Sequence, residues 1–487
     1  MEGKFHEETR SAPWLNTSRA LAVSPAHRRP WWALVAICVG NFMIVADIAA
    51  ITVALPSIKV NLGFSDTSLV WVINAYLVTY AGFLLVGGRL ADIFGHRRLL
   101  LSGVLVFTGA SLGCALPRTA TELIIARSIQ GVGGALLAAA TLSLITRLFE
   151  APKERARAIG VYIFACSSGG LLGVALAGVL TSLLSWRWIF LVNLPLGALA
   201  YMLSMALLPR DRPGDTQRII DVPGAIAVTT FLLLAVYAVV DGDRVGWMSA
   251  QTLVLLGAAT VALILFLLIE ARAPAPLVPL TIFSHHNLLV CCVTNVLYSA
   301  AATSSAVLVS LYLQRILNYD PLEVGLAYLP WSGTTAIFAL GLSAKLVIRF
   351  GIKRPLALGL VANVVAFLLF ARAPEGGSLL TDALPAIILF GFSAGVVYNP
   401  ILVAATNSVS AGEAGLVSGV INTASLIGRV LGLAVFIAVA SAHANALSAA
   451  GVGSLTALNQ GYHLAFLLGA TCAACALAAA WRLLRTD

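Results

Sequence analysis

Long apolar segments recur along almost the whole chain, and they restrict it to very few folds. Each is about 20 residues long, enough for an α-helix to cross the ~30 Å hydrocarbon core of a bilayer. Apolar residues make up 60% of the 487 residues and charged residues only 10%, whereas a soluble domain carries about 25% charged residues. Within lipid only helices and closed barrels satisfy the backbone, and barrel strands give weaker, alternating segments. The sequence therefore predicts an all-α membrane protein.

The apolar pattern predicts fourteen transmembrane helices. Of the 30 Lys and Arg residues, 22 fall on the same side of the membrane as the N-terminus, 6 on the opposite side and 2 inside spans. Since Lys and Arg accumulate in cytoplasmic loops, both termini are expected in the cytoplasm, with the chain in the inner (cell) membrane. The predicted spans are 31–56, 69–90, 98–116, 121–145, 156–180, 187–208, 223–240, 251–270, 287–313, 323–347, 354–371, 383–406, 415–439 and 462–484.

A basic turn between two apolar helices occurs twice. Residues 88–98 and 344–354 both end in Phe-Gly, one variable residue and a basic pair. Each copy follows the second helix of its half if the halves are helices 1–6 and 9–14, so the sequence predicts two pseudo-symmetric six-helix bundles and an inserted helix pair. Such duplicated halves are common in secondary transporters. The predicted regions are a disordered cytoplasmic tail (1–30), the first bundle (31–208), a linker (209–222), the inserted pair (223–270) and the second bundle (287–484).

Several short motifs follow one another in a fixed order from about residue 31 to residue 480. In chain order, the motifs are Asp47 with residues 54–56; residues 71–77; the turn at 88–98; Arg127 and Gln130 with residues 131–134; residues 186–190 with Asn193, Pro195 and Gly197; and Gly415 with Ser418, Gly419 and Asn422. In this order they resemble the major facilitator superfamily, in particular its fourteen-helix drug–proton antiporter branch. The fifth helix departs from the antiporter pattern, with Val174 in place of a proline and Ala177 in place of a glycine.

Asp47 is the only carboxylate in the interior of a predicted span. A charge at that depth costs at least ~2.5–3.5 kcal/mol on insertion scales, so it needs a function or a partner. Arg127 lies at a similar height in the outer half of the membrane, so the two side chains can pair or communicate through water. We predict that Asp47 and Arg127 couple transport to proton binding, a role that the family resemblance also implies. The alternative is a static ion pair that fixes two helices.

The first basic turn is the predicted gating motif. Its residues are Gly88, Arg89, Asp92, Gly95, Arg97 and Arg98. Glycine permits a tight turn and close helix approach, and Asp92 is expected to accept hydrogen bonds from basic neighbours or from a helix N-terminus. In the second copy Ile348 replaces the acid, so only the first half carries the complete motif. The alternative is a simple topology anchor.

Arg429 is the second arginine inside a span, and no acid on the second half's helices neutralises it. Together with Asp47 and Arg127 it leaves a positive interior, which favours a neutral, zwitterionic or anionic amphiphile over a bare cation. Snorkelling of Arg429 is the alternative. A drug-sized pocket is mostly apolar with a few placed polar groups. The predicted cavity residues are Asn41, Asn74, Tyr76, Gln130, Tyr162, Asn295, Tyr298, Trp331, Asn399, Asn422 and Arg429.

The sequence predicts a secondary transporter that exports an amphiphilic small molecule, such as a drug, antibiotic or natural product, in exchange for protons. It contains no phosphate-binding loop and no cluster with metal-ligand spacing, so we expect no enzyme activity, cofactor or metal. The +9 charge follows from topology rather than from binding to nucleic acid, and a monomer is expected. Two alternatives remain open: uptake or facilitated diffusion of a metabolite, and a non-transporting membrane sensor or partner protein.

Overall fold

The computed structural model describes residues 25–149, 151–211, 222–273, 276, 284–408 and 414–484, and these are almost entirely helical. Residues 1–24 of the predicted tail and 212–221 of the predicted linker lie outside the described part. The first helix begins at Pro25, within the range predicted as tail. The predicted all-α membrane class is confirmed.

The first bundle is built from six long helices and two short ones. Its central helices α4 and α5 pack closely because Gly103 and Gly133 lack side chains. A Cβ on Gly133 would lie 2.4 Å from the Phe107 nitrogen, and one on Gly103 2.5 Å from the Leu137 nitrogen. Small residues allow such close backbone contact between membrane helices. The elements are α1 (Pro25–Leu62), α2 (Asp66–Leu69), α3 (Trp71–Phe94), α4 (His96–Ala115), α5 (Ala120–Leu148), α6 (Pro152–Leu183), α7 (Trp188–Leu191) and α8 (Asn193–Leu207).

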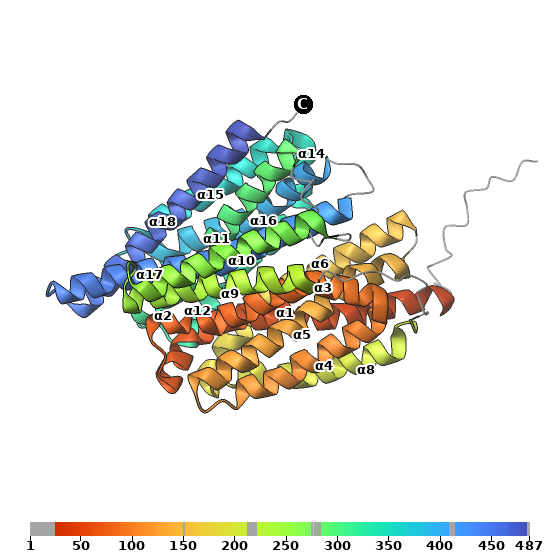
Figure 1. Cartoon of the computed structure of the whole chain (residues 1–487), viewed down its shortest axis with the longest axis horizontal. Coiled ribbons are helices and arrows are strands. Elements are labelled where there is room, and N and C mark those ends of the chain that lie inside the picture. The colour runs from red at the N-terminus through yellow and green to blue at the C-terminus, as the bar shows by residue number, and fades with distance from the viewer. Residues whose placement is uncertain are drawn as a thin grey trace, which may run out of the picture.

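Two helices between the bundles, α9 (Val222–Val245) and α10 (Ala250–Arg272), form the inserted pair. They pack on each other, and α9 also contacts α3 of the first bundle and α17 of the second. Figure 1 shows the green α9 and α10 lying across the junction of the two bundles. The inserted pair therefore covers one side of the interface between the halves.

The second bundle contains interrupted helices as well as continuous ones. Where a single span 323–347 was predicted, the chain instead forms α12, α13, a π-helical segment η2 and α14. Pro321 and Pro330 stand in the first turns of α12 and α13, where proline is tolerated because its missing N–H has no helical partner. The elements are α11 (His286–Arg315), α12 (Pro321–Ala327), α13 (Leu329–Ile337), η2 (Phe338–Leu342), α14 (Ser343–Phe350), α15 (Lys353–Phe370), η3 (Leu379–Ala383), α16 (Leu384–Thr406), α17 (Ala414–Ala449) and α18 (Ser454–Leu483).

Within the described residues, twelve helices are long and apolar enough to cross a membrane. The other two predicted spans fall on α9, whose apolar stretch Ile226–Gly242 is shorter, and on the interrupted run from α12 to α14. All fourteen predicted ranges are thus helical, and twelve of them coincide with helices of spanning length.

The two basic turns have the same backbone feature. Gly95, between α3 and α4, has φ +97°, and Gly351, between α14 and α15, has φ +75°. Residues with a side chain rarely adopt positive φ, so both turns depend on glycine. The same backbone conformation at both turns is expected if the two halves are related.

Candidate functional site

A buried ion pair joins α1 and α5 inside the first bundle. Arg127 Nη1 lies 2.6 Å from Asp47 Oδ2, and the two side chains are each only 1% exposed. At this depth either charge alone would be costly, because an unpaired buried ion loses its hydration without compensation. The two predicted proton-coupling residues are therefore in direct contact and buried.

The remaining acceptor sites of Asp47 are occupied by neutral donors. Gln130 Nε2 donates to Asp47 Oδ1 over 3.0 Å and Asn193 Nδ2 donates to the same oxygen over 2.9 Å. Gln130 also donates to the Ser111 hydroxyl over 2.8 Å. Gln130, Asn193 and Ser111 lie on α5, α8 and α4. Together with α1, which carries Asp47, four helices therefore contribute to the hydrogen-bond network around this carboxylate. Gln130 thus lies in this network, although we predicted it for the substrate cavity.

Arg127 extends the network to α3. Its Nε donates to the Val72 carbonyl over 2.9 Å, and its guanidinium lies 4.6 Å above the centre of the Tyr76 ring. Tyr76 in turn stacks on Tyr80, with ring centres 5.7 Å apart. A cation over an aromatic face is attracted by the ring quadrupole. The ion pair is thus connected to the face of α3 that carries Tyr80.

Other predicted cavity residues join helices within a bundle. Asn41 donates to Thr141 over 2.8 Å and Asn295 to the Ile421 carbonyl over 2.7 Å. Such contacts are the ordinary interhelical hydrogen bonds of membrane bundles. The others form pairs or stacks: Tyr162 with Asn41 (3.5 Å), Asn399 with Ser343 (3.4 Å), Tyr398 with Asn422 (2.8 Å), and Trp331 with Tyr328 and Phe390 (ring centres 5.5 and 5.1 Å).

In the described part of the chain, side chains of Asn74, Ser310 and Gln314 form hydrogen bonds that cross directly from one bundle to the other. Asn74 of α3 donates to the Val430 carbonyl of α17 over 3.2 Å. From α11, Ser310 donates to the Thr52 carbonyl over 2.7 Å and Gln314 to the Val53 carbonyl over 3.0 Å. We predicted Asn74 as a cavity residue rather than as a contact between the bundles, and made no prediction for Ser310 and Gln314, because a polar residue in a span does not reveal which helix it faces.

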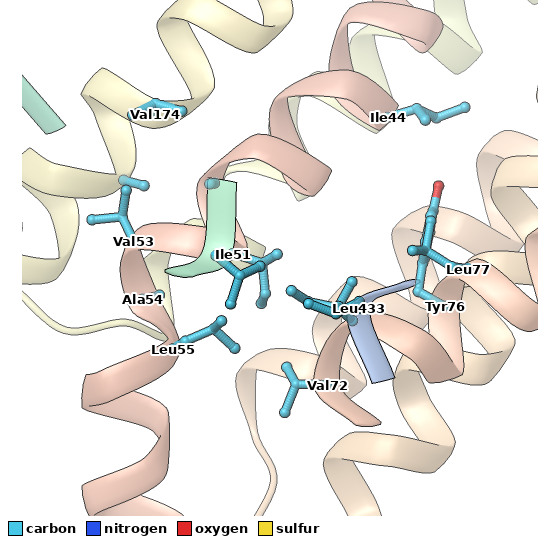
Figure 2. Close-up of a cluster of buried hydrophobic side chains, with 14 of the residues drawn as sticks. Ile44, Ile51, Val53, Ala54, Leu55, Val72, Tyr76, Leu77, Val174 and Leu433 are labelled. Atoms are coloured by element: carbon cyan, nitrogen blue, oxygen red, sulfur yellow. The ribbon is translucent and has the colours of Figure 1, made fainter. Parts of the chain in front are cut away.

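An apolar junction accompanies these bonds. We define it as Ile51 and Leu55 of α1, Val72 and Leu77 of α3, and Leu433 of α17, all of them buried. Figure 2 shows Leu433 reaching in between the α1 and α3 side chains, with Tyr76 beside it. The junction therefore excludes water where the bundles meet.

A cavity of about 920 Å³ opens beside this junction. It lies between α1, α2 and α3 on one side and α11, α17 and α18 on the other, and Leu55, Ile73 and Leu433 belong to its wall. Lys59 and Arg315 line it, with no acid among its lining residues. None of the predicted cavity residues contributes to it. Its position was missed because its wall is formed by helix ends and short loops that carry no distinctive motif.

Arg429 lies on the other side of the junction from this cavity. It is exposed, and its helix, α17, packs against α3 of the first bundle and against α11 and α16 of the second. In the described part of the chain no carboxylate forms an ion pair with it. Its predicted role in the substrate cavity stays a prediction.

The first basic turn is closed by a residue that we did not predict. Asp211, just after α8, accepts hydrogen bonds from the backbone nitrogens of Arg97 (3.1 Å) and Arg98 (3.0 Å) at the start of α4. A Cβ on Gly95 would lie 2.2 Å from the Asp211 carboxyl carbon, so glycine also makes room for this contact. Arg97 Nη2 donates to the Met205 carbonyl over 2.6 Å.

The remaining residues of the predicted gating motif show no comparable contacts in the described part of the chain. The side chains of Arg89 and Asp92 lie outside the described part, so their predicted role stays a prediction. Gly88 has open space where a Cβ would be, so the close helix approach predicted for Gly88 is wrong.

Two helical bundles, a buried ion pair in one and a water-excluding junction between them define a polytopic membrane transporter of the secondary type. Residues 37–433 match the model of the Major Facilitator Superfamily. The chain therefore belongs to this superfamily, which confirms the resemblance drawn from its motifs, and it is a transporter rather than an enzyme.

Similar proteins agree with this assignment. The chain is 37% identical to the puromycin resistance protein pur8 of Streptomyces alboniger, over 83% of this chain and 81% of that protein. It is 35% identical to the cephamycin export protein CmcT of Amycolatopsis lactamdurans, over 84% of each. It is 34% identical to the lincomycin resistance protein of Streptomyces lincolnensis, over 91% of this chain and 92% of that protein.

Solved structures show the same fold at low sequence identity. The nucleoside transporter NupG matches with a TM-score of 0.66 and 14% identity, covering 93% of this chain and 100% of that chain. The inward-open xylose transporter XylE of E. coli matches with a TM-score of 0.62 and 14% identity, covering 94% and 97%.

Proposed function

We propose that this protein exports an amphiphilic small molecule across the cell membrane in exchange for protons, by alternating access. Both termini face the cytoplasm, fourteen helices span the bilayer and the monomer is the working unit. Support for the substrate class comes from the relatives, whose names refer to puromycin, cephamycin and lincomycin. Support for the orientation comes from the distribution of Lys and Arg.

The observation that carries the coupling is the closed network around Asp47. Protonation of Asp47 would remove the negative charge that Arg127 faces at 2.6 Å. Arg127 would then be a buried cation without a counterion, a state that costs several kcal/mol. The protonated protein is therefore driven toward an arrangement in which Arg127 is rehydrated or re-paired. This is how proton binding can bias two conformations of the bundles.

The contacts around Arg127 offer a route for that bias. Arg127 touches Tyr76, Tyr76 stacks on Tyr80, and α3, which carries both tyrosines, packs on α17 of the second bundle. Movement of α17 against α3 would break the Asn74–Val430 bond and open the apolar junction. In the proposed orientation the 920 Å³ cavity faces outward and the junction closes it from the cytoplasm.

The test uses everted membrane vesicles and the variant Asp47→Asn. Wild-type vesicles energised to an acidic lumen are expected to release protons when puromycin, a cephamycin or lincomycin is added, and to accumulate that compound. Asp47→Asn should lose both activities. Glu375→Gln, which changes an acid in the loop between α15 and η3, is the matched control and should behave as wild type.

Other outcomes identify the alternatives. Uphill accumulation by Asp47→Asn, in protein that elutes as a single species, would refute the coupling role. Flux that needs no gradient would indicate a facilitator, for which the altered α6 motif (Val174, Ala177) is the supporting feature. If the wild-type protein transports none of the three compounds, the alternative of a non-transporting membrane sensor is favoured.

A further inference from the structure

Arg429 lies inside the apolar span of α17. It is ten residues from Gly419, where the apolar span of α17 begins, or ~15 Å along the axis at ~1.5 Å per residue. An arginine inside an apolar span is expected to face the bundle interior, water or a substrate rather than lipid tails.

The packing of α17 places this arginine between the bundles. Ser425, one turn before it, shares a hydrogen bond of 2.8 Å with Ser299 of α11, and the Val430 carbonyl after it accepts from Asn74 of α3. Asn422, Arg429 and Leu433 fall on one helix face, because they are seven and four residues apart. Asn422 binds Tyr398 and Leu433 enters the apolar junction (Figure 2). Arg429 therefore faces the space between the halves at the inner edge of that junction.

The side chains around Arg429 suit an anion attached to an aromatic or apolar body. The guanidinium has five N–H donors in a planar fork that matches a carboxylate, and charge-assisted bonds of this kind are about twice as strong as neutral ones. Tyr398 bonds Asn422 on the same face of α17. Tyr298 lies on α11 between Asn295 and Ser299, which both bond α17, and Tyr80 lies on α3, whose Asn74 bonds the Val430 carbonyl. These three tyrosines supply rings and hydroxyl groups to this region. In the described part no protein carboxylate occupies this position, unlike the position facing Arg127.

We propose that Arg429, with Tyr80, Tyr298 and Tyr398, forms the recognition site for a carboxylate on an amphiphilic aromatic substrate. This inference rests on the proposed function, because it names the chemical class of the exported molecule. It assigns the two membrane arginines different tasks: Arg127 holds the coupling acid and Arg429 holds the cargo.

The test compares two probes that differ only in charge. Dansyl-phenylalanine carries a carboxylate, and dansyl-phenylalaninamide is its neutral amide. Binding of each to the full-length protein in phosphatidylcholine nanodiscs is followed by energy transfer from tryptophan, with empty nanodiscs subtracted. This binding assay uses no proton gradient. A negative binding result therefore does not affect the transport test of Asp47, and a negative transport result does not affect the interpretation of the binding assay.

We expect wild type to bind the acid at least about tenfold more tightly than the amide, as charge-assisted hydrogen bonds imply. Arg429→Gln should weaken acid binding by about the same factor and leave the amide within about twofold. Arg429→Lys should retain part of the preference, and Tyr398→Phe should weaken acid binding by a smaller factor. Competition of the acid by phosphatidylglycerol added to the nanodiscs would instead identify a lipid as the occupant and overturn the proposal.

Two further results would overturn the inference. One is a wild type with no preference for the acid over the amide. The other is an Arg429→Gln protein, monodisperse on size exclusion, that binds the acid as wild type does or loses both probes equally. Equal loss would show that Arg429 supports the fold rather than reads a charge.

Discussion

The two bundles carry one membrane arginine each, and they treat it in opposite ways. Arg127 in the first bundle is 1% exposed, bound to Asp47 and covered by Tyr76. Arg429 in the second bundle is exposed and, among the described residues, forms no ion pair. A charge whose partner is within the protein is part of the structure, whereas a charge that lacks one is available to a ligand. The contrast indicates that coupling and recognition are divided between the halves.

The backbone follows the same division. The second helix of the first half, α3, is continuous from Trp71 to Phe94. The corresponding part of the second half is divided between α12, α13, η2 and α14. Short π-helical segments inside helices occur frequently at functional sites. The first bundle is therefore built as a stable frame, and the second bundle contains the irregular helix.

The largest expected difference between the two arginines is in their contribution to the stability of the protein. Arg127→Gln leaves Asp47 as a buried charge without a counterion, so we expect a loss of about 3–5 kcal/mol. Arg429→Gln removes no described ion pair and should change stability by less than about 1 kcal/mol. Thermal unfolding of purified protein, followed by fluorescence-detected size exclusion, measures both.

The double variant Asp47→Asn with Arg127→Gln controls for the pair. It should be less destabilised than the sum of the two single variants, because the two residues interact directly. Equal sensitivity of the Arg127 and Arg429 variants would contradict the division between a structural and a ligand-binding arginine.

Much of the fold follows from the sequence because lipid imposes simple requirements. Apolar length predicted the helices. The tight turn predicted at Gly95 has positive φ, and so does the corresponding glycine of the second copy, Gly351. The break between α12 and α14 was not predicted, since an apolar stretch with proline can continue as a kinked helix. The start of α1 at Pro25 was missed for a related reason: helix ends outside the hydrocarbon are not fixed by hydrophobicity.

The candidate site was predicted less completely. The Asp47–Arg127 contact could be predicted, because each charge needs a partner and both lie at one height. Asn193 and Ser111 could not, because a neutral side chain in a span has no such requirement and its helix face is unknown. Asp211 was missed because it acts across 114 residues of sequence on the start of α4. Contacts of this kind depend on how elements assemble, not on local pattern.

Contact between the bundles gives the next test, of intermediate size. Gly178 of α6 lies against α12, and a Cβ there would be 2.7 Å from the Pro321 carbonyl oxygen. Gly178→Leu should therefore destabilise the described arrangement by about 1–3 kcal/mol, as overpacking does. Because the clash lies at a contact between the two bundles, it should push them apart at that position rather than unfold the protein.

A thiol placed at Gln314 reports that shift. In a cysteine-free background, Gln314→Cys should react faster with a membrane-impermeant maleimide when Gly178→Leu is also present. Gly160→Leu is the matched control on the same helix, since open space surrounds that position, and it should leave the rate unchanged. Equal rates in all three proteins would show that the Gly178 contact does not hold the halves together.

The smallest expected effect separates the two basic turns. In the first turn Asp211 caps α4, whereas at the second turn Ile352 precedes α15 without a side-chain hydrogen bond. Asp211→Ala should cost about 0.5–2 kcal/mol, the usual range for loss of a helix cap, and should speed amide hydrogen exchange at the start of α4. Ile352→Asp should slow exchange at the start of α15, because a carboxylate there can cap the helix and complement its dipole. Since each change acts on one turn only, exchange at the other turn serves as the internal control. Faster exchange at both turns in Asp211→Ala would mean that the residue stabilises the whole cytoplasmic face and that the two turns are not independent.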